Sequence, residues 1–236
     1  MSGKIRGLEI YLTYDTIDPA DDSSNYSVDF QYHPKPVYSF IKRTFDLIVS
    51  LFCIILLLIP FLIISLIIII DDKSAPPIFV QKRVGKNGKL FNIYKFRTMC
   101  ADAEDKLVEI QHLNEADGPV FKIKNDPRIT RVGAFLRASN IDELPQLFDI
   151  FLGHMSFVGP RPPLPKEVEQ YRDSDNLRLL VKPGLSCYWQ VTKNRNDVPF
   201  DEWMELDRKY IMERSAWVDV KLIIKTFFFL FKRSGY

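Results

Sequence analysis

One uncharged apolar run, from Leu47 to Ile70, interrupts the mixed polar and apolar pattern of the chain. As an α-helix this run would reach about 36 Å, which exceeds the hydrocarbon core of a bilayer at about 30 Å. Pro60 lies inside the run, where a proline removes a backbone donor and bends a helix. Length and hydropathy favour a membrane-spanning helix, and a re-entrant hairpin that bends at Pro60 is the alternative.

The charges that flank the run bear on its topology. Lys42 and Arg43 precede it, and Asp71, Asp72 and Lys73 follow it. Positively charged flanks tend to stay in the cytoplasm. A true span would therefore place residues 71–236 outside, whereas a hairpin would keep both flanks inside. The flanks alone leave both topologies open.

A β-hairpin is predicted directly after the apolar run. Residues 78–84 and 90–96 alternate as strands do, and the Asn87-Gly88 pair between them is a strong tight-turn signal. Lys95 and Arg97 should point to the same face, where two cations could hold a diphosphate. The alternative is that Lys95 and Arg97 simply belong to a solvated strand edge. Judged from these two residues alone, this alternative is favoured.

Helical spacing of apolar residues predicts several helices in the rest of the chain. We expect them over residues 101–116, from Asp126-Pro127 through Leu136, from about Asp142 through Leu152, and over residues 200–214. Residues 176–192 are expected to form a loop and then a strand at 189–191. The predicted fold class is therefore mainly α with a small β-hairpin (α+β).

One acid falls within an apolar stripe of the helix predicted at 200–214. Asp207 shares a face with Trp203, Tyr210 and Ile211 at steps of three and four residues. Burying a carboxylate is costly unless a partner compensates it. Asp207 is therefore either paired structurally or directed at a ligand, and the residues leave both alternatives open.

The last apolar segment, from Leu222 to Phe231, is too short to span a membrane. Phe227, Phe228 and Phe229 with nearby cations suit an amphipathic helix that lies in the plane of the membrane interface. Burial against the domain core is an equally good alternative.

The first 37 residues differ in composition from the rest. They are polar, contain three prolines and carry a net charge of −3, whereas the remainder carries +5. We expect a loose N-terminal extension over residues 1–37, a membrane helix over 38–72 and a catalytic domain over 73–236. The apolar run starts too late for a secretory signal.

Composition excludes some classes of function. A net charge of +2, with no basic run interleaved with aromatic residues, argues against a nucleic-acid partner. The three cysteines are scattered, so neither a disulfide framework nor a zinc site is indicated. The mildly basic body suits anionic lipid headgroups and phosphate ligands.

Residues 130–163 carry the most informative set of reactive side chains. Asp142 and Glu143 form a carboxylate pair at a predicted helix start, with Arg137 before them and Arg161 in a proline-rich loop after them. A carboxylate can attack phosphorus, and arginines or Mg²⁺ can offset the repulsion between the two anions. The stretch therefore predicts phosphate chemistry, with a divalent metal, next to a membrane.

These motifs resemble the monotopic phosphoglycosyl transferases, the bacterial sugar transferase family that starts polysaccharide and glycoconjugate assembly on polyprenyl phosphate. The resemblance covers about residues 38–234. It is carried by KRTFD at 42–46, FVQKRVG at 79–85, KFRTM at 95–99, DELPQL at 142–147 and MSFVGPRP at 155–162.

The resemblance implies a reaction. Sugar-1-phosphate would pass from a UDP-sugar to polyprenyl (undecaprenyl) phosphate, giving polyprenyl diphosphate sugar and UMP through an aspartyl-phosphosugar intermediate. It also implies a compact membrane-associated domain on the cytoplasmic face of the bacterial inner membrane. The family enters the bilayer by a re-entrant helix, which assigns the bend to Pro60 and reverses the preference for a span.

The resemblance also implies roles for individual residues. Asp142 would be the nucleophile, Glu143 would assist it, and both would bind Mg²⁺ with Lys95 nearby. The other implied substrate and phosphate contacts are Arg97, Arg137, Arg161, Asp207, Gln190 and Arg195.

Three departures from the family pattern are present. Ile59 stands where the family often has a serine before the helix-breaking proline. The stretches 183–187 and 192–196 replace the usual Pro-Gly-x-Thr-Gly and Gly-Arg patterns, and the second is one residue longer. These departures weaken the inferred sugar preference more than any other expectation.

Two other functions compete with this one. A glycosyltransferase that moves the sugar alone would release UDP, and a membrane scaffold would release no nucleotide. The intact Asp142, Glu143, Lys95 and Arg161 argue against a scaffold. The sequence identifies neither the sugar nor the polymer, and it leaves open the role of residues 1–37 and whether the protein forms a homo-oligomer.

Overall fold

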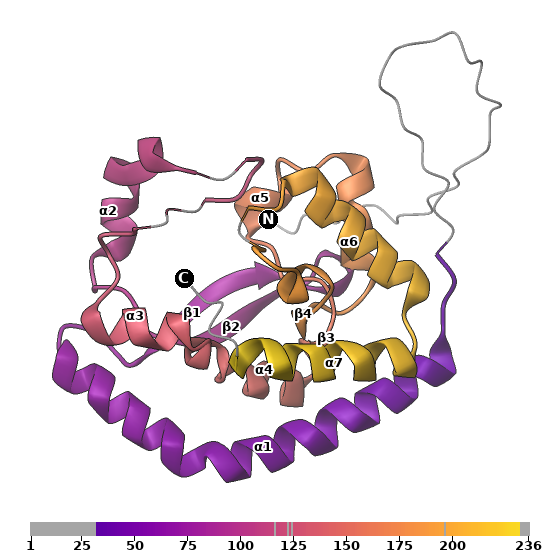
Figure 1. The fold of residues 1–236 in the computed structure, drawn as a ribbon, viewed down its shortest axis with the longest axis horizontal. Coiled ribbons are helices and arrows are strands. Elements are labelled where there is room, and N and C mark those ends of the chain that lie inside the picture. The colour runs from indigo at the N-terminus through magenta and orange to yellow at the C-terminus, as the bar shows by residue number, and fades with distance from the viewer. Residues whose placement is uncertain (1–31, 116, 122, 124, 196, 232–236) are drawn as a thin grey trace, which may run out of the picture.

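The computed structural model describes residues 32–231 apart from residues 116, 122, 124 and 196. The fold is mainly helical, with two small sheets and one long apolar helix near the N-terminus (Figure 1). The α-helices are α1 (Pro36–Asp71), α2 (Ala103–Ile110), α3 (Arg131–Ala138), α4 (Gln146–Leu152), α5 (Pro165–Val168), α6 (Phe200–Glu213) and α7 (Ala216–Phe231). The strands are β1 (Ile78–Val84), β2 (Leu90–Phe96), β3 (Ser156–Val158) and β4 (Gly184–Ser186). The 3₁₀ turns are η1 (Lys86–Gly88), η2 (Gln111–Leu113), η3 (Ile141–Glu143), η4 (Asp173–Leu180) and η5 (Trp189–Val191). The proposed extension at residues 1–37 lies largely outside the described residues.

Helix α1 contains the apolar run and is bent, and the other labelled helices and strands lie on its concave side (Figure 1). Pro60 is inside the helix, where it leaves the carbonyl of Leu56 without its usual backbone donor. The most apolar 18-residue window of α1 has a mean hydropathy of 3.5, and only 11% of that window is buried. By length and composition α1 is able to cross a membrane. Asp46, Ser50, Phe61 and Ile68 are buried on its inner face.

The predicted β-hairpin is confirmed. Strands β1 and β2 pair antiparallel, from Ile78 opposite Phe96 to Val84 opposite Leu90. The turn between them places Asn87 and Gly88 at φ of 57° and 74°. Both residue types tolerate this left-handed region, which is why the Asn-Gly pair predicted the turn.

A second sheet was not predicted. Strands β3 and β4 pair in parallel, and the strand expected at 189–191 is wrong because these residues form the 3₁₀ turn η5. Gly159 and Gly184 approach each other just beyond β3. A Cβ on Gly159 would lie 2.3 Å from the carbonyl oxygen of Lys182, and one on Gly184 would lie 2.1 Å from the Gly159 nitrogen. Only glycine allows the backbones to come this close.

The predicted helices are present, with some shifted ends. Helix α3 begins at Arg131 rather than near Asp126-Pro127, because the Thr130 hydroxyl caps it by accepting from the Gly133 amide at 3.0 Å. Asp126 instead forms a 2.7 Å ion pair with Arg128. Helix α2 spans the middle of the segment predicted at 101–116 and continues into η2.

Helix α7 is longer than the predicted segment and has two distinct faces. Leu222 is 1% exposed and packs in the core with Tyr210 and Ile211, whereas Trp217 and Phe228 are largely exposed. One face of the segment is therefore buried against the core, as the second alternative predicted, whereas its location in a membrane interface stays a prediction. Two further core clusters lie beneath α1 and around Trp189 and Trp203.

Candidate active site

The carboxylate pair lies in the short turn η3, between α3 and α4. Asn140 precedes the turn with a φ of 55°, and Pro145 follows it as the N-cap of α4. The left-handed residue reverses the chain, so that Asp142 and Glu143 project ahead of α4 rather than from its side. The predicted helix start is thus a 3₁₀ turn, and α4 itself begins at Gln146.

Lys95 joins strand β2 to the carboxylate pair. Its ammonium group donates to Glu143 Oε1 at 2.8 Å, and the Glu143 side chain remains 37% exposed. Burial by itself would raise the pKa of Glu143, but the charge and hydrogen bond of Lys95 outweigh burial and lower it. Glu143 is therefore ionised at neutral pH.

Asp142 shows the opposite shift. Burial and the neighbouring charge of Glu143 raise the pKa of Asp142, and Lys95 and Arg137 oppose this effect. Two adjacent carboxylates with pKa values pushed apart are a common feature of catalytic sites. Arg137 is held beside Asp142 by its Nε, which donates to the Thr98 hydroxyl at 2.8 Å.

The Pro160–Pro163 loop that carries Arg161 is fixed along its whole backbone. Each of its four successive carbonyl oxygens accepts a hydrogen bond from a residue outside the loop. The donors, in loop order, are Gly184 N at 2.9 Å, Arg178 at 3.0 Å, Arg83 at 3.1 Å and Val84 N at 2.9 Å. The Arg161 side chain makes none of these bonds, so it is left available for a ligand on a rigid support.

A pair of stacked tryptophans supports two arginines. The rings of Trp189 and Trp203 lie 4.2 Å apart and 15° from parallel. Arg161 packs over Trp203, and Arg195 packs over Trp189, each at 5.9 Å from the ring centroid. Arg195 also donates to the side-chain oxygen of Asn140 at 3.0 Å. The charges of both arginines contribute to lowering the pKa of Glu143, so the site gathers cations around the pair.

Asp207 is paired within the protein. It is 1% exposed and forms a 2.9 Å ion pair with Arg178, and burial raises its pKa to about 6 despite this partner. Arg178 also donates to the Tyr171 hydroxyl at 2.8 Å and to the Arg161 carbonyl. The contacts of Asp207 therefore reach the site through Arg178 and the loop of Arg161.

Two of the expected ligand contacts form no hydrogen bond or ion pair with the carboxylate pair among the described residues. Arg97 is buried and forms an ion pair with Asp72 at the end of α1, so it does not share one ligand face with Lys95. Gln190 contributes a buried side-chain oxygen that has no hydrogen-bond partner among the described residues. Roles of Arg97 and Gln190 in substrate binding stay predictions.

The carboxylate pair is the place where Mg²⁺ would fit. No group of three or more His, Cys, Asp or Glu side chains is gathered for a metal within the described part of the chain. Mg²⁺ is commonly held by one or two carboxylates and completes its shell with water and substrate phosphates. Asp142 and Glu143, the latter partly exposed, suit a metal that is bound together with a diphosphate.

The sequence did not reveal several supporting residues. Arg178, Trp189 and Trp203 were not assigned to the site, because nothing in their local sequence shows that they stack or pair across the fold. Asn140, two residues before Asp142, offers a usable signal, since asparagine is enriched in the left-handed backbone region. Thr98 lies within the KFRTM motif but has no distinctive spacing of its own.

A family model described as "Bacterial sugar transferase" matches residues 37–233. The chain therefore belongs to the bacterial sugar transferase family, which confirms the resemblance drawn from its motifs. The matched range includes α1, the carboxylate pair and the Arg161 loop.

Curated relatives agree with this assignment. The undecaprenyl-phosphate galactose phosphotransferase of Salmonella typhimurium is 40% identical over 83% of this chain and 41% of its own length. The galactosyl transferase CpsE of Streptococcus agalactiae is 45% identical over 66% of this chain and 35% of its own length. The exopolysaccharide production protein ExoY of Rhizobium meliloti is 35% identical over 81% of this chain and 86% of its own length. The chain thus spans about two fifths or less of the first two relatives and most of the third.

Proposed function

We propose that this protein transfers a sugar-1-phosphate from a UDP-sugar to polyprenyl phosphate, releasing UMP. The observation that carries the proposal is the carboxylate pair itself, with Lys95 bonded to Glu143 and Arg137 beside Asp142. The names of two relatives support the substrates, since one is an undecaprenyl-phosphate galactose phosphotransferase and another a UDP-glucose:undecaprenyl-phosphate glucose-1-phosphate transferase.

The reaction proceeds in two displacements at the same phosphorus atom. An oxygen of the Asp142 carboxylate attacks the β-phosphorus of the UDP-sugar, the bond from that phosphorus to the bridging oxygen breaks, and UMP leaves with the electron pair. A phosphate oxygen of the polyprenyl phosphate then attacks the phosphosugar held on Asp142. The Asp142–phosphorus bond breaks, and polyprenyl diphosphate sugar is released.

The surrounding cations reduce the repulsion between anions in both steps. Arg161 and Arg195 can bind phosphate oxygens bidentately, and their support on the two tryptophans orients them before substrate arrives. Lys95 keeps Glu143 ionised, so that Asp142 is the member of the pair with the more basic oxygen. Bound Mg²⁺ would add charge neutralisation on the phosphates.

The proposed topology is a re-entrant α1 with both ends on the cytoplasmic side of the bacterial inner membrane. Both ends of α1 are fastened to the catalytic domain. Arg43 donates to the carbonyls of Ile150 and Phe151 near one end, and Asp72 pairs with Arg97 at the other. Because α1 packs along α3, α4 and α7, a straight crossing would draw the site helix α4 into hydrocarbon.

The nucleotide released distinguishes this function from its alternatives. We would incubate detergent-solubilised protein with polyprenyl phosphate, Mg²⁺ and a panel of UDP-sugars. UMP as the product supports phosphosugar transfer and identifies the sugar at the same time. UDP as the product would assign a glycosyltransferase, and no nucleotide from folded protein with any UDP-sugar would contradict the proposed donor.

A further inference from the structure

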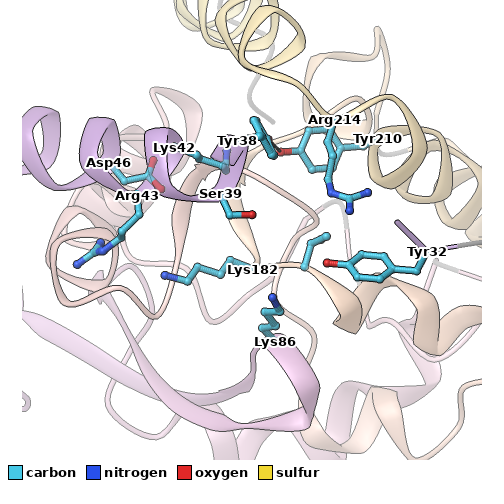
Figure 2. Close-up of a pocket in the computed structure, with 11 residues that line it drawn as sticks. Tyr32, Tyr38, Ser39, Lys42, Arg43, Asp46, Lys86, Lys182, Tyr210 and Arg214 are labelled. Carbon is cyan, nitrogen blue, oxygen red and sulfur yellow. Dashed lines mark hydrogen bonds between the residues drawn. The ribbon is translucent and has the colours of Figure 1, made fainter. Parts of the chain in front are cut away.

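A hollow separate from the carboxylate pair lies beneath the first turns of α1 (Figure 2). It has a volume of about 90 Å³, whereas one water needs about 10–15 Å³ by the same kind of measure. It therefore has room for a group of several heavy atoms. Its walls come from segments far apart in sequence, namely the start of α1, η1, the residues before β4, and the end of α6.

The lining of the hollow is strongly basic. Its charged members are Lys42, Arg43, Lys86, Lys182 and Arg214, against the single carboxylate of Asp46. The hydroxyl group of Tyr32 adds a neutral donor, whereas those of Tyr38 and Ser39 already donate to Asp219 and to the Lys35 carbonyl. Such a lining matches a phosphate group, which takes charge-assisted hydrogen bonds from ammonium and guanidinium groups and further bonds from hydroxyls.

Some of these cations already have partners. Lys42 forms a 2.6 Å ion pair with Asp219, and that carboxylate also accepts from Tyr38 at 2.8 Å and from Tyr210 at 2.9 Å. Arg43 donates to two backbone carbonyls, which use two of its five donors and carry no formal charge to neutralise it.

Lys86 and Lys182 are different, because neither side chain forms a hydrogen bond or ion pair with the described residues. Figure 2 shows both lysines beside the hollow, on separate segments. Burial lowers the pKa of Lys182, and so do the nearby charges of Arg43, Lys86 and Lys42, which together outweigh the opposing effect of Asp46. The lysines thus repel their neighbours, and a bound anion would relieve this repulsion.

The position of the hollow indicates where the anion comes from. The outer side of the same turns of α1 carries the exposed apolar side chains of Phe40, Ile41 and Phe45. Residues of α1 that line the hollow alternate with these apolar residues, so the hollow lies where α1 would enter the headgroup region of a bilayer. A phospholipid phosphate is abundant at that depth, and anionic headgroups attract basic segments.

We propose that this hollow, the α1 headgroup pocket, binds the phosphate of an anionic membrane phospholipid through Lys86 and Lys182. A bound headgroup bridges α1 to η1 and to the segment before β4. It also lies beside Arg43, which bonds to the C-terminal carbonyls of α4, the helix that follows the carboxylate pair. The pocket is thus a membrane anchor whose lining does not include the carboxylate pair.

The test uses full-length protein in a neutral detergent and calorimetric titration with monomeric dihexanoyl-phosphatidylglycerol. The wild type should bind saturably, and the Lys86→Gln/Lys182→Gln variant should bind at least tenfold more weakly. A Lys82→Gln/Lys89→Gln variant is the matched control, because it removes two exposed lysines outside the pocket and the same total charge. Thermal unfolding of all three proteins checks that each is folded.

Two further measurements distinguish a lipid headgroup from inorganic phosphate and from the phosphate of the acceptor substrate. Inorganic phosphate that binds as tightly as the lipid would overturn the assignment to a headgroup. Equal lipid binding by the pocket and control variants would overturn the pocket. A raised KM for polyprenyl phosphate in the pocket variant would reassign the hollow to the acceptor substrate, whereas an unchanged KM with lost lipid binding supports the proposal.

Discussion

The Lys95 ammonium group donates a 2.8 Å hydrogen bond to Glu143, a residue 48 positions later in the chain. This contact brings strand β2 to the turn that carries the carboxylate pair. It also separates the two acids chemically, because Lys95 lowers the pKa of Glu143 while burial and the charge of Glu143 raise that of Asp142. Two adjacent acids of similar intrinsic acidity thereby acquire different proton affinities.

Replacing Lys95 should move the pH dependence of the reaction. In Lys95→Met the pKa of Glu143 should rise, since the group that lowers it is gone, and the acidic limb of the activity profile should shift to higher pH. The rate at the optimum should fall by about 10²-fold, a typical cost for one charged group aimed at developing charge. The pH profile of UMP release measures both effects. The Lys95→Arg variant keeps the positive charge, so its acidic limb should move less than that of Lys95→Met. An equal shift in the two variants would contradict the conclusion that the charge of Lys95 lowers the pKa of Glu143.

The Asp142→Asn variant should lose UMP release by at least about 10³-fold, because an amide cannot form the phosphosugar bond. Protein incubated with UDP-sugar labelled at the β-phosphorus should become labelled in the wild type and stay unlabelled in the variant. Asp105→Asn, which changes an exposed acid of α2, is the matched control. Full activity of Asp142→Asn would exclude the covalent mechanism.

The ion pair between Asp207 and Arg178 should be chiefly structural. Asp207→Ala leaves the buried guanidinium unpaired, so the free energy of unfolding should fall by about 3–5 kcal/mol. The double variant Asp207→Leu/Arg178→Met removes both charges and should recover much of this loss, as thermal unfolding in detergent would show. Asp207→Ala with unchanged stability but a raised KM for the UDP-sugar would instead assign Asp207 to direct substrate binding.

Asp149 provides a test of pH-dependent stability. It is fully buried in α4, where burial raises its pKa to about 7 and the hydrogen bond from the Tyr94 amide only partly opposes this. The folded state thus binds this proton more tightly than the unfolded state does. The Asp149 carboxyl therefore makes a favourable contribution to the free energy of unfolding at acidic pH, and this contribution is lost as pH rises through about 7. Asp149→Asn should be more stable than the wild type at pH 8 by about 1–3 kcal/mol.

The gain in Asp149→Asn should shrink toward pH 5, where the wild-type carboxyl is protonated. Thermal unfolding at both pH values measures the difference. A gain of equal size at pH 5 and pH 8 would show that ionisation of Asp149 is not its cause.

Labelling should place both ends of α1 on one side of the membrane. Val37→Cys and Ser74→Cys would be made singly in a background with Cys53→Ala and Cys100→Ala, which leaves only the buried Cys187. A membrane-impermeant maleimide should label both positions in inside-out vesicles and neither in intact cells. Labelling of the two positions from opposite sides would establish a spanning helix.

Local sequence predicted the elements whose structure depends on neighbouring residues. The hairpin followed from period-two alternation and an Asn-Gly turn, and α6 followed from helical spacing of its buried face. The carboxylate pair and the Arg161 loop also stood out, because acids, arginines and prolines were concentrated in one short stretch. The start of α3 was placed too early, since Asp126-Pro127 is a good local signal but Thr130 makes the actual cap.

The sequence by itself determined the apolar run, the presence of the carboxylate pair and the family. Only the tertiary structure decided which cations act on Glu143, that Asp207 reaches the site through Arg178, and that lysines at 86 and 182 share one hollow. The physical reason is that these relationships join residues far apart in the chain, and no local pattern encodes them. Burial, which raises the pKa values of Asp142, Asp149 and Asp207, likewise exists only once the chain is packed.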